Sequence, residues 1–165
     1  MTHVNAGAAA PDFSVKGLDG KTYSLADLLQ KGPVVAAFFK VSCPVCQFTF
    51  PFVERLHQRY GKAATFLGIS QDDAKSTDSF ARDHGITFPM AMDEKEKGYV
   101  ASNAYGLTMV PTIFLIDADK SAQVSTMGFV KADLERIAKE LAERGRLQQT
   151  SLFSPSESVP ANKPG

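Results

Sequence analysis

The feature that most restricts the fold of this sequence is an unbroken run of six apolar residues at positions 34–39, which ends four residues before Cys43. Apolar residues occupy every position of the run instead of alternate ones, which is typical of a strand covered on both faces. Strands of this kind lie inside sheets that carry helices on both sides. The run therefore predicts a layered α/β fold with residues 34–39 in the interior of the sheet.

Strand and helix patterns alternate along the rest of the chain. Residues 12–15 and 21–23 flank a Gly-Leu-Asp-Gly turn and predict a β-hairpin. Further strands are expected at residues 65–70, 87–92, 112–117 and 123–127. Helices are expected near residues 25–29, 43–60, 74–84, 100–105 and 131–146. This alternation predicts an α/β sandwich.

Composition and charge exclude several classes of partner. The chain has 165 residues, of which 44% are apolar, and this suffices for one domain with its own core. Eighteen basic residues balance eighteen acidic ones, so the formal net charge is zero. A neutral chain has no long-range field that would attract nucleic acid or an anionic membrane. We therefore expect neither as a partner, and the composition does not indicate an oligomeric state.

The two ends of the chain differ from its middle. Residues 1–9 lack the basic region and the apolar run of a secretory signal, which predicts a flexible N-terminus and a cytoplasmic protein. A periplasmic or exported protein whose signal peptide has been removed would look similar. Residues 148–165 are rich in Gln, Ser and Pro and show no period, which predicts a C-terminal tail. The folded domain is then expected at residues 10–147.

Cys43 and Cys46 are the residues most able to carry chemistry. Their i, i+3 spacing over the first turn of a helix places both sulfurs on one face, and Pro44 fits the first helical position. Unpaired N–H groups at a helix N-terminus stabilise a thiolate, so Cys43 is expected to be the nucleophile and Cys46 the resolving cysteine. Lys40 either adds positive potential there or is a solvated lysine at a strand end. Glu54, further along the helix, is expected to be a surface charge.

A metal site or an inert pair are the alternatives to redox chemistry at these cysteines. A disulfide that encloses two residues removes little chain entropy, so a purely structural bridge is disfavoured. A zinc site needs further ligands, and His57 lies fourteen residues beyond Cys43. That separation is about 20 Å along a helix. We therefore expect no metal, although a non-enzymatic thiol-binding or metal-binding module remains an alternative function.

The chain resembles the redoxin branch of the thioredoxin superfamily over about residues 10–145. This branch includes TlpA- and ResA-like thiol-disulfide oxidoreductases and the AhpC/TSA peroxiredoxins. The likeness rests on Ala-Pro-Asp-Phe at residues 10–13, on Pro51 eight residues after Cys43, and on Val-Pro-Thr at residues 110–112. It implies a thioredoxin-like fold, with a central mixed sheet flanked by helices, an N-terminal β-hairpin and an inserted α-β unit.

The resemblance also implies how a substrate would dock. In the family, the proline that Pro111 matches follows a cis peptide bond and faces the cysteines, which leaves the backbone of Val110 free to pair with an extended substrate. Ser42 replaces the tryptophan that usually precedes the first cysteine, so one wall of the docking surface is either missing or supplied by Phe39 or another aromatic residue. Ala37 replaces a buried carboxylate, and the proton of Cys46 must then leave by another route.

Two departures from the peroxiredoxin pattern separate the candidate activities. Peroxiredoxins have Thr three residues before the reactive cysteine and Arg where this sequence has Pro111, whereas this chain has Lys40 and Pro111. We therefore predict a thiol-disulfide oxidoreductase that needs no cofactor beyond a redox-active Cys43–Cys46 disulfide. Its expected partners are protein disulfides or dithiols and a reductase or oxidant. The alternative is a thiol peroxidase with Cys43 as its peroxidatic and Cys46 as its resolving cysteine.

Overall fold

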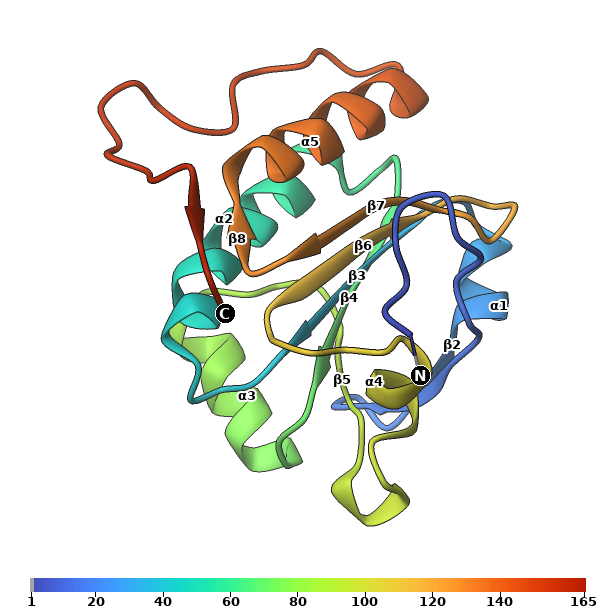
Figure 1. The fold of residues 1–165 in the computed structure, drawn as a ribbon. Helices are drawn as coiled ribbons and strands as arrows, with labels where there is room; N and C mark the ends of the chain where they lie inside the picture. Colours follow the sequence, from blue (N-terminus) through green and yellow to red (C-terminus); the bar gives the residue numbers. More distant parts are fainter. Residues whose placement is uncertain (1) are drawn as a thin grey trace.

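The computed structural model describes residues 2–165, which form a mixed sheet with helices on both faces (Figure 1). Its strands are β1 (Ser14–Gly17), β2 (Thr22–Ser24), β3 (Val34–Phe39), β4 (Thr65–Ser70), β5 (Met90–Met92), β6 (Thr112–Ile116) and β7 (Ala122–Met127). Its helices are α1 (Leu25–Leu29), α2 (Pro44–Tyr60), α3 (Ala74–Asp83), α4 (Val100–Ala104) and α5 (Lys131–Gly145), with a short 3-10 helix at Lys95–Lys97. The strand order is β2-β1-β5-β4-β3-β6-β7.

The apolar run at residues 34–39 forms β3 in the interior of the sheet. This strand pairs in parallel with β4 and antiparallel with β6, and all six of its residues are buried. The hairpin β1–β2 extends the other edge by pairing with β5. The expected strand at residues 87–92 is shorter, because β5 begins only after Pro89, which has no N–H for the ladder. The prediction of a mixed α/β sheet is confirmed.

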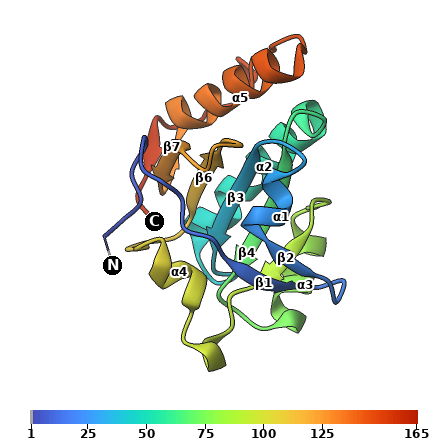
Figure 2. The ribbon, with the colours of Figure 1, turned by 90° about the vertical axis from the view of Figure 1, so that its right-hand side faces the viewer.

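Alternate residues of β3 contribute to two separate cores. Val35, Ala37 and Phe39 pack on the face that carries α2 and α5, while Val34, Ala36 and Phe38 pack on the face with α1 and α4. Figure 2 shows the sheet between these helices from a second side. No helix in the described part of the chain is both long and apolar enough to cross a membrane. The cysteines therefore lie on one defined side of the sheet, with α2.

The start of α2 follows from its first residues. Cys43 is the N-cap in an extended conformation, and Pro44 occupies the first turn, where its missing N–H costs no hydrogen bond. Phe50, Val53 and Leu56 form the buried stripe of the helix. Pro51 lies inside the helix on its exposed side. The loop from β3 thus delivers the cysteine pair to the N-terminus of a helix that is fixed by its core contacts.

The chain beyond α5 packs against the helical face instead of leaving the domain. Leu152 and Phe153 are 1% and 5% exposed and belong to the core beneath α2 and α5. Further on, β9 (Asn162–Lys163) pairs antiparallel with β8 (Phe129–Val130). Figure 1 shows this red segment returning past α5 to end near the start of α2. At the other end of the chain, Val4 is also buried. The limits of the folded domain at residues 10 and 147 stay predictions.

Candidate active site

Cys43 lies where the first turn of α2 meets the loop before β6. Its side chain is half-buried, and its sulfur accepts a hydrogen bond from the N–H of Cys46 at 3.3 Å. The Cys43 thiol also donates to the carbonyl oxygen of Val110 at 3.5 Å. Both cysteines are free thiols. The sulfur is thus accessible at the N-terminus of a helix, and this position suits a nucleophile.

Cys46 lies one turn deeper and is completely buried. Burial is the main cause that raises the pKa of its thiol, and the nearby Cys43 and Asp72 act in the same direction. A buried thiol of this kind stays protonated until a reaction partner is brought to it. The two cysteines therefore differ in access to solvent, and burial makes Cys46 the thiol that is harder to ionise.

The loop before β6 brings Val110 and Pro111 to the cysteines. The register of the antiparallel pair β3–β6 sets Phe38 opposite Thr112, so the loop before Thr112 meets the loop after β3. The Val110–Pro111 peptide bond is cis. Pro111 is buried, and its carbonyl oxygen accepts a hydrogen bond from the N–H of Gly128 at 2.7 Å. Val110 remains half-buried, with its carbonyl oxygen directed at Cys43.

Phe39 is not at this surface, and its expected role as a docking wall is wrong. Its ring is fully buried and packs against Phe50 and Phe80, with centroids 4.4 and 4.7 Å away. Another aromatic residue, Phe48, lies in the first half of α2; it is half-buried and packs edge-on against Phe129 at 5.0 Å. Lys40 is exposed and makes no ion pair among the described residues.

Asp72 is a site residue that the sequence analysis missed. Its carboxylate accepts a hydrogen bond from the N–H of Val41 at 2.8 Å, which holds the loop between β3 and Cys43. Asp72 follows β4, the parallel neighbour of β3. Residues that follow neighbouring parallel strands meet at the same sheet edge. A polar residue just after the strand expected at residues 65–70 could therefore have indicated a group close to the cysteine loop.

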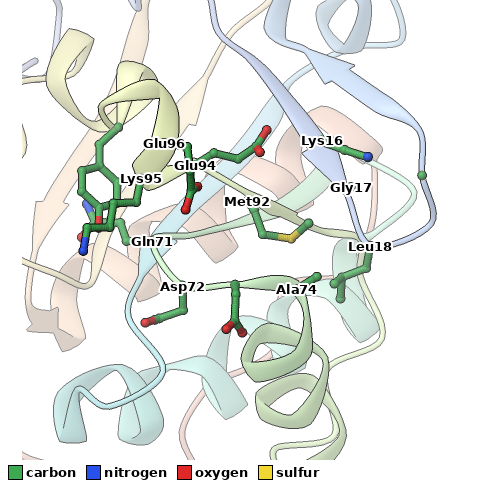
Figure 3. A pocket seen from close by; sticks show the side chains of 13 residues that line it. Lys16, Gly17, Leu18, Gln71, Asp72, Ala74, Met92, Glu94, Lys95 and Glu96 are labelled. Atoms are coloured by element: carbon green, nitrogen blue, oxygen red, sulfur yellow. The ribbon is translucent and has the colours of Figure 1, made fainter.

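A cavity of about 640 Å³ adjoins this edge on the side of the hairpin. Figure 3 shows Lys16 and Leu18 from the hairpin on one side, Asp72 at the start of the α3 segment, and Glu94 and Glu96 from the loop before α4. Neither cysteine lines this cavity. The cavity thus lies next to the loop that Asp72 holds, but it is separate from the reacting sulfurs.

Glu54 is not the surface charge that its position in the sequence suggested. Its side chain is buried and accepts hydrogen bonds from the N–H and hydroxyl of Thr87 at 2.8 and 2.7 Å and from the amide of Gln58. Burial opposes ionisation, but these hydrogen bonds outweigh it and lower the pKa of Glu54. His57 lies beside Glu54, far along the helix from Cys43. The described residues contain no cluster of three potential metal ligands.

Comparison with known proteins places this geometry in a family. The model of the AhpC/TSA family matches residues 6–124. The chain belongs to the AhpC/TSA family. Within this family of redoxins, the thiol-disulfide oxidoreductase ResA of Geobacillus thermodenitrificans is 32% identical over 138 residues, which cover 82% of this chain and 77% of that protein. The prediction of a redoxin related to thiol-disulfide oxidoreductases is confirmed, and the peroxidase alternative has less support.

Solved structures give the same result for the fold of this redoxin. A thiol:disulfide interchange protein of the thioredoxin family from Chlorobium tepidum TLS is 28% identical with a TM-score of 0.67, covering 82% of this chain and 96% of its own. A secreted disulfide oxidoreductase from Mycobacterium tuberculosis matches with a TM-score of 0.64 at 22% identity, covering 79% and 95%. The thioredoxin-like fold is therefore confirmed.

Proposed function

We propose that this redoxin exchanges disulfides with protein substrates through Cys43 and Cys46. The observation that carries the proposal is the asymmetry of the pair, because a half-exposed sulfur at a helix N-cap stands in front of a fully buried thiol. A nucleophile needs access and a stabilised thiolate, whereas a resolving thiol needs protection from solvent and proximity.

The exchange proceeds in two displacements. The Cys43 thiolate attacks one sulfur of a substrate disulfide, so the substrate S–S bond breaks and one substrate sulfur leaves as a thiolate that takes up a proton. Cys46 then loses its proton and attacks the sulfur of Cys43, which releases the second substrate thiol and forms the Cys43–Cys46 disulfide. Two electrons pass to the substrate, and a dithiol reductant must supply two electrons to restore the free thiols. The reverse sequence oxidises a substrate dithiol.

The docking surface in this proposal combines backbone and apolar groups. An extended substrate would lie beside the carbonyl oxygen of Val110, which already contacts Cys43. Met127, at the end of β7, is 41% exposed and receives a weak hydrogen bond from the Thr108 hydroxyl next to this loop. Phe48, half-buried on α2 against Phe129, would border the site on the helical side. Lys40 remains a candidate for favouring the thiolate through its charge.

The proposal assigns no cofactor and no metal, and its partners are a protein disulfide or dithiol and a redox protein that regenerates the pair. We also propose that the protein works outside the cytoplasm. The cytoplasmic location expected from the sequence finds no support among the relatives, and one relative in structure is described as secreted.

Trapping tests this function directly. In Cys46→Ser, Cys43 can still attack a substrate disulfide, but the resolving step is blocked, so mixed disulfides should accumulate on Cys43. Cys43→Ser is the matched control and should trap nothing. The absence of mixed disulfides in Cys46→Ser, with both variants folded, would contradict disulfide exchange. Turnover of hydrogen peroxide that depends on Cys43 and exceeds disulfide reduction would favour the peroxidase alternative.

A further inference from the structure

Residues 161–165 lie against the backbone group beside which a substrate is proposed to dock. A Cβ atom at Gly165 would overlap the carbonyl oxygen of Val110 and would lie 2.8 Å from the Val110 carbonyl carbon and 3.4 Å from the nitrogen of Pro111. The backbone of Gly165 is therefore in contact with the same carbonyl group that contacts the Cys43 thiol. We call residues 161–165 the strap.

The strap is an extended strand paired to a short edge. Asn162 and Lys163 pair antiparallel with Val130 and Phe129, and the N–H of Lys131 donates to the carbonyl oxygen of Ala161 at 2.9 Å. Pairing of this kind uses main-chain groups, so it would accept many sequences in extended form. The edge at β8 thus offers a generic binding site for a polypeptide, and here a segment of the same chain occupies it.

One side chain of the strap adds a specific contact. The Lys163 ammonium lies 4.6 Å from the centroid of the Phe48 ring, on the helix that carries the cysteines. A cation over an aromatic face is attracted by the negative charge of the ring face. The site beside Cys43 therefore favours a basic side chain two residues before the residue that meets Val110.

The strap is held in place by an anchor in the preceding segment. Glu157 forms a two-point ion pair with Arg55 of α2, with N–O distances of 2.8 and 3.0 Å, and Arg55 also donates to the carbonyl oxygen of Leu152 at 2.8 Å. Leu152 and Phe153 are buried in the core. The movable part is thus limited to the residues that follow Glu157.

We propose that the strap occupies the substrate groove of this redoxin, which runs from β8 past Phe48 to Val110, and competes there with extended polypeptides that carry Lys or Arg at the position of Lys163. Cys43 itself remains half-exposed with the strap in place. Small disulfides therefore reach the sulfur without displacing the strap, whereas polypeptide disulfides must displace it. This inference rests on the proposed disulfide exchange and names the substrate class for the same site.

Removal of residues 160–165 tests the strap, because this variant keeps Leu152, Phe153 and Glu157. The rates to compare are those for an extended Lys-containing peptide disulfide and for the small disulfide 5,5′-dithiobis(2-nitrobenzoate). If the strap fills the groove nine-tenths of the time, removing it raises kcat/KM for the peptide about tenfold. The rate with the small disulfide should stay within about twofold. Gly165→Ala, which cannot keep its contact with Val110, should give a smaller change in the same direction.

A peptide added in trans completes the test. A peptide with the sequence of residues 159–165 should inhibit the shortened variant at roughly millimolar concentration, which is the effective concentration of a tethered segment. The same peptide with Glu in place of Lys163 should inhibit less. If the shortened variant and Gly165→Ala both reduced the peptide disulfide no faster than the unaltered protein, while still reducing the small disulfide, the proposed role of the strap would be wrong. If the unaltered protein reduced neither the peptide disulfide nor the small disulfide, the proposed function itself would be refuted.

Discussion

The sulfur of Cys43 and the carbonyl oxygen of Val110 lie 3.5 Å apart, although 67 residues separate them along the chain. The register of β3 against β6 sets this distance, because it brings the loops at the two strand ends together. The proposed nucleophile and the proposed docking backbone are thus positioned by the same pair of strands, whereas the strap that meets the same carbonyl is a separate segment. Substitutions in the strap should therefore change the access of polypeptides to Cys43 without changing the reactivity of its thiol.

The two cysteines should react with alkylating agents at very different rates. Cys46 is completely buried and burial raises the pKa of its thiol, while Cys43 is half-exposed. Each unit by which a pKa rises removes about tenfold of the thiolate at neutral pH. We expect iodoacetamide to modify Cys43 at least about a hundredfold faster, measured by mass spectrometry of the folded protein. In guanidinium, where the protein is unfolded, the two cysteines should react at similar rates. Similar rates in the folded protein would contradict the proposed roles.

The segment after α5 should contribute to the stability of the whole domain. Leu152 is 1% exposed, and replacing a buried Leu by Ala typically costs about 2–5 kcal/mol. Leu152→Ala should therefore lower the free energy of unfolding by that amount in urea. Val100→Ala is the control, because Val100 is 63% exposed and surface changes stay within about 0.5 kcal/mol. Similar effects of the two changes would show that the segment is not part of the core.

Alanine substitutions at two glycines distinguish the effect of backbone strain from the effect of displacing the strap. Gly128 has a φ of 71°, and a Cβ there would lie 2.5 Å from the carbonyl oxygen of Lys163. Gly85 has a φ of 65° with no atom within 4 Å of such a Cβ. Both changes to Ala carry the strain of a positive φ, of about 1–2 kcal/mol. Only Gly128→Ala should also raise the rate with peptide disulfides, and the same rate change in Gly85→Ala would argue against the strap.

The Arg55–Glu157 ion pair should stabilise the protein at neutral pH and lose its effect in acid. Hydrogen bonds from Arg55 and from the N–H of Ser154 lower the pKa of Glu157 from 4.5 to about 2. Because the folded pKa is the lower one, the stabilisation is present above pH 4.5 and is lost as the pH falls toward 2. Glu157→Gln should therefore lower the thermal midpoint at pH 7 and have little effect near pH 2.

An exposed ion pair provides the control for this change. Asp78 and Arg82 are 3.0 Å apart on α3, with side chains 53% and 72% exposed. Exposed pairs of this kind contribute little to stability, so Asp78→Asn should leave the midpoint nearly unchanged at either pH. If Glu157→Gln lowered the thermal midpoint at pH 2 as much as at pH 7, the acid effect could not be assigned to Glu157.

Local patterns predicted β3 and the start of α2, because an apolar run and an i, i+3 cysteine pair each depend on residues close together in the sequence. The proline loop was expected only from the resemblance of residues 110–112 to the redoxin family. The side of the sheet on which Phe39 packs could not be predicted in this way. Every position of β3 is apolar, so the pattern does not distinguish its two faces.

Contacts over long sequence separations were also beyond the sequence analysis. Arg55 and Glu157 are 102 residues apart, and Glu54 meets Thr87 across 33 residues. Neither contact belongs to a periodic pattern, since each joins a helix to an irregular segment. Residues 148–165 therefore looked like a tail, although Leu152 and Phe153 supply two buried side chains to the core.

The position of Gly165 against Val110 has a practical consequence for the design of fusion proteins. A tag or reporter joined after residue 165 would begin in contact with the carbonyl group beside which a substrate is proposed to dock, and its linker would leave the protein close to Cys43. Kinetic measurements on such a fusion would reflect the attachment as well as the thiol pair. Labels for activity measurements are better attached at exposed positions of the hairpin turn between β1 and β2.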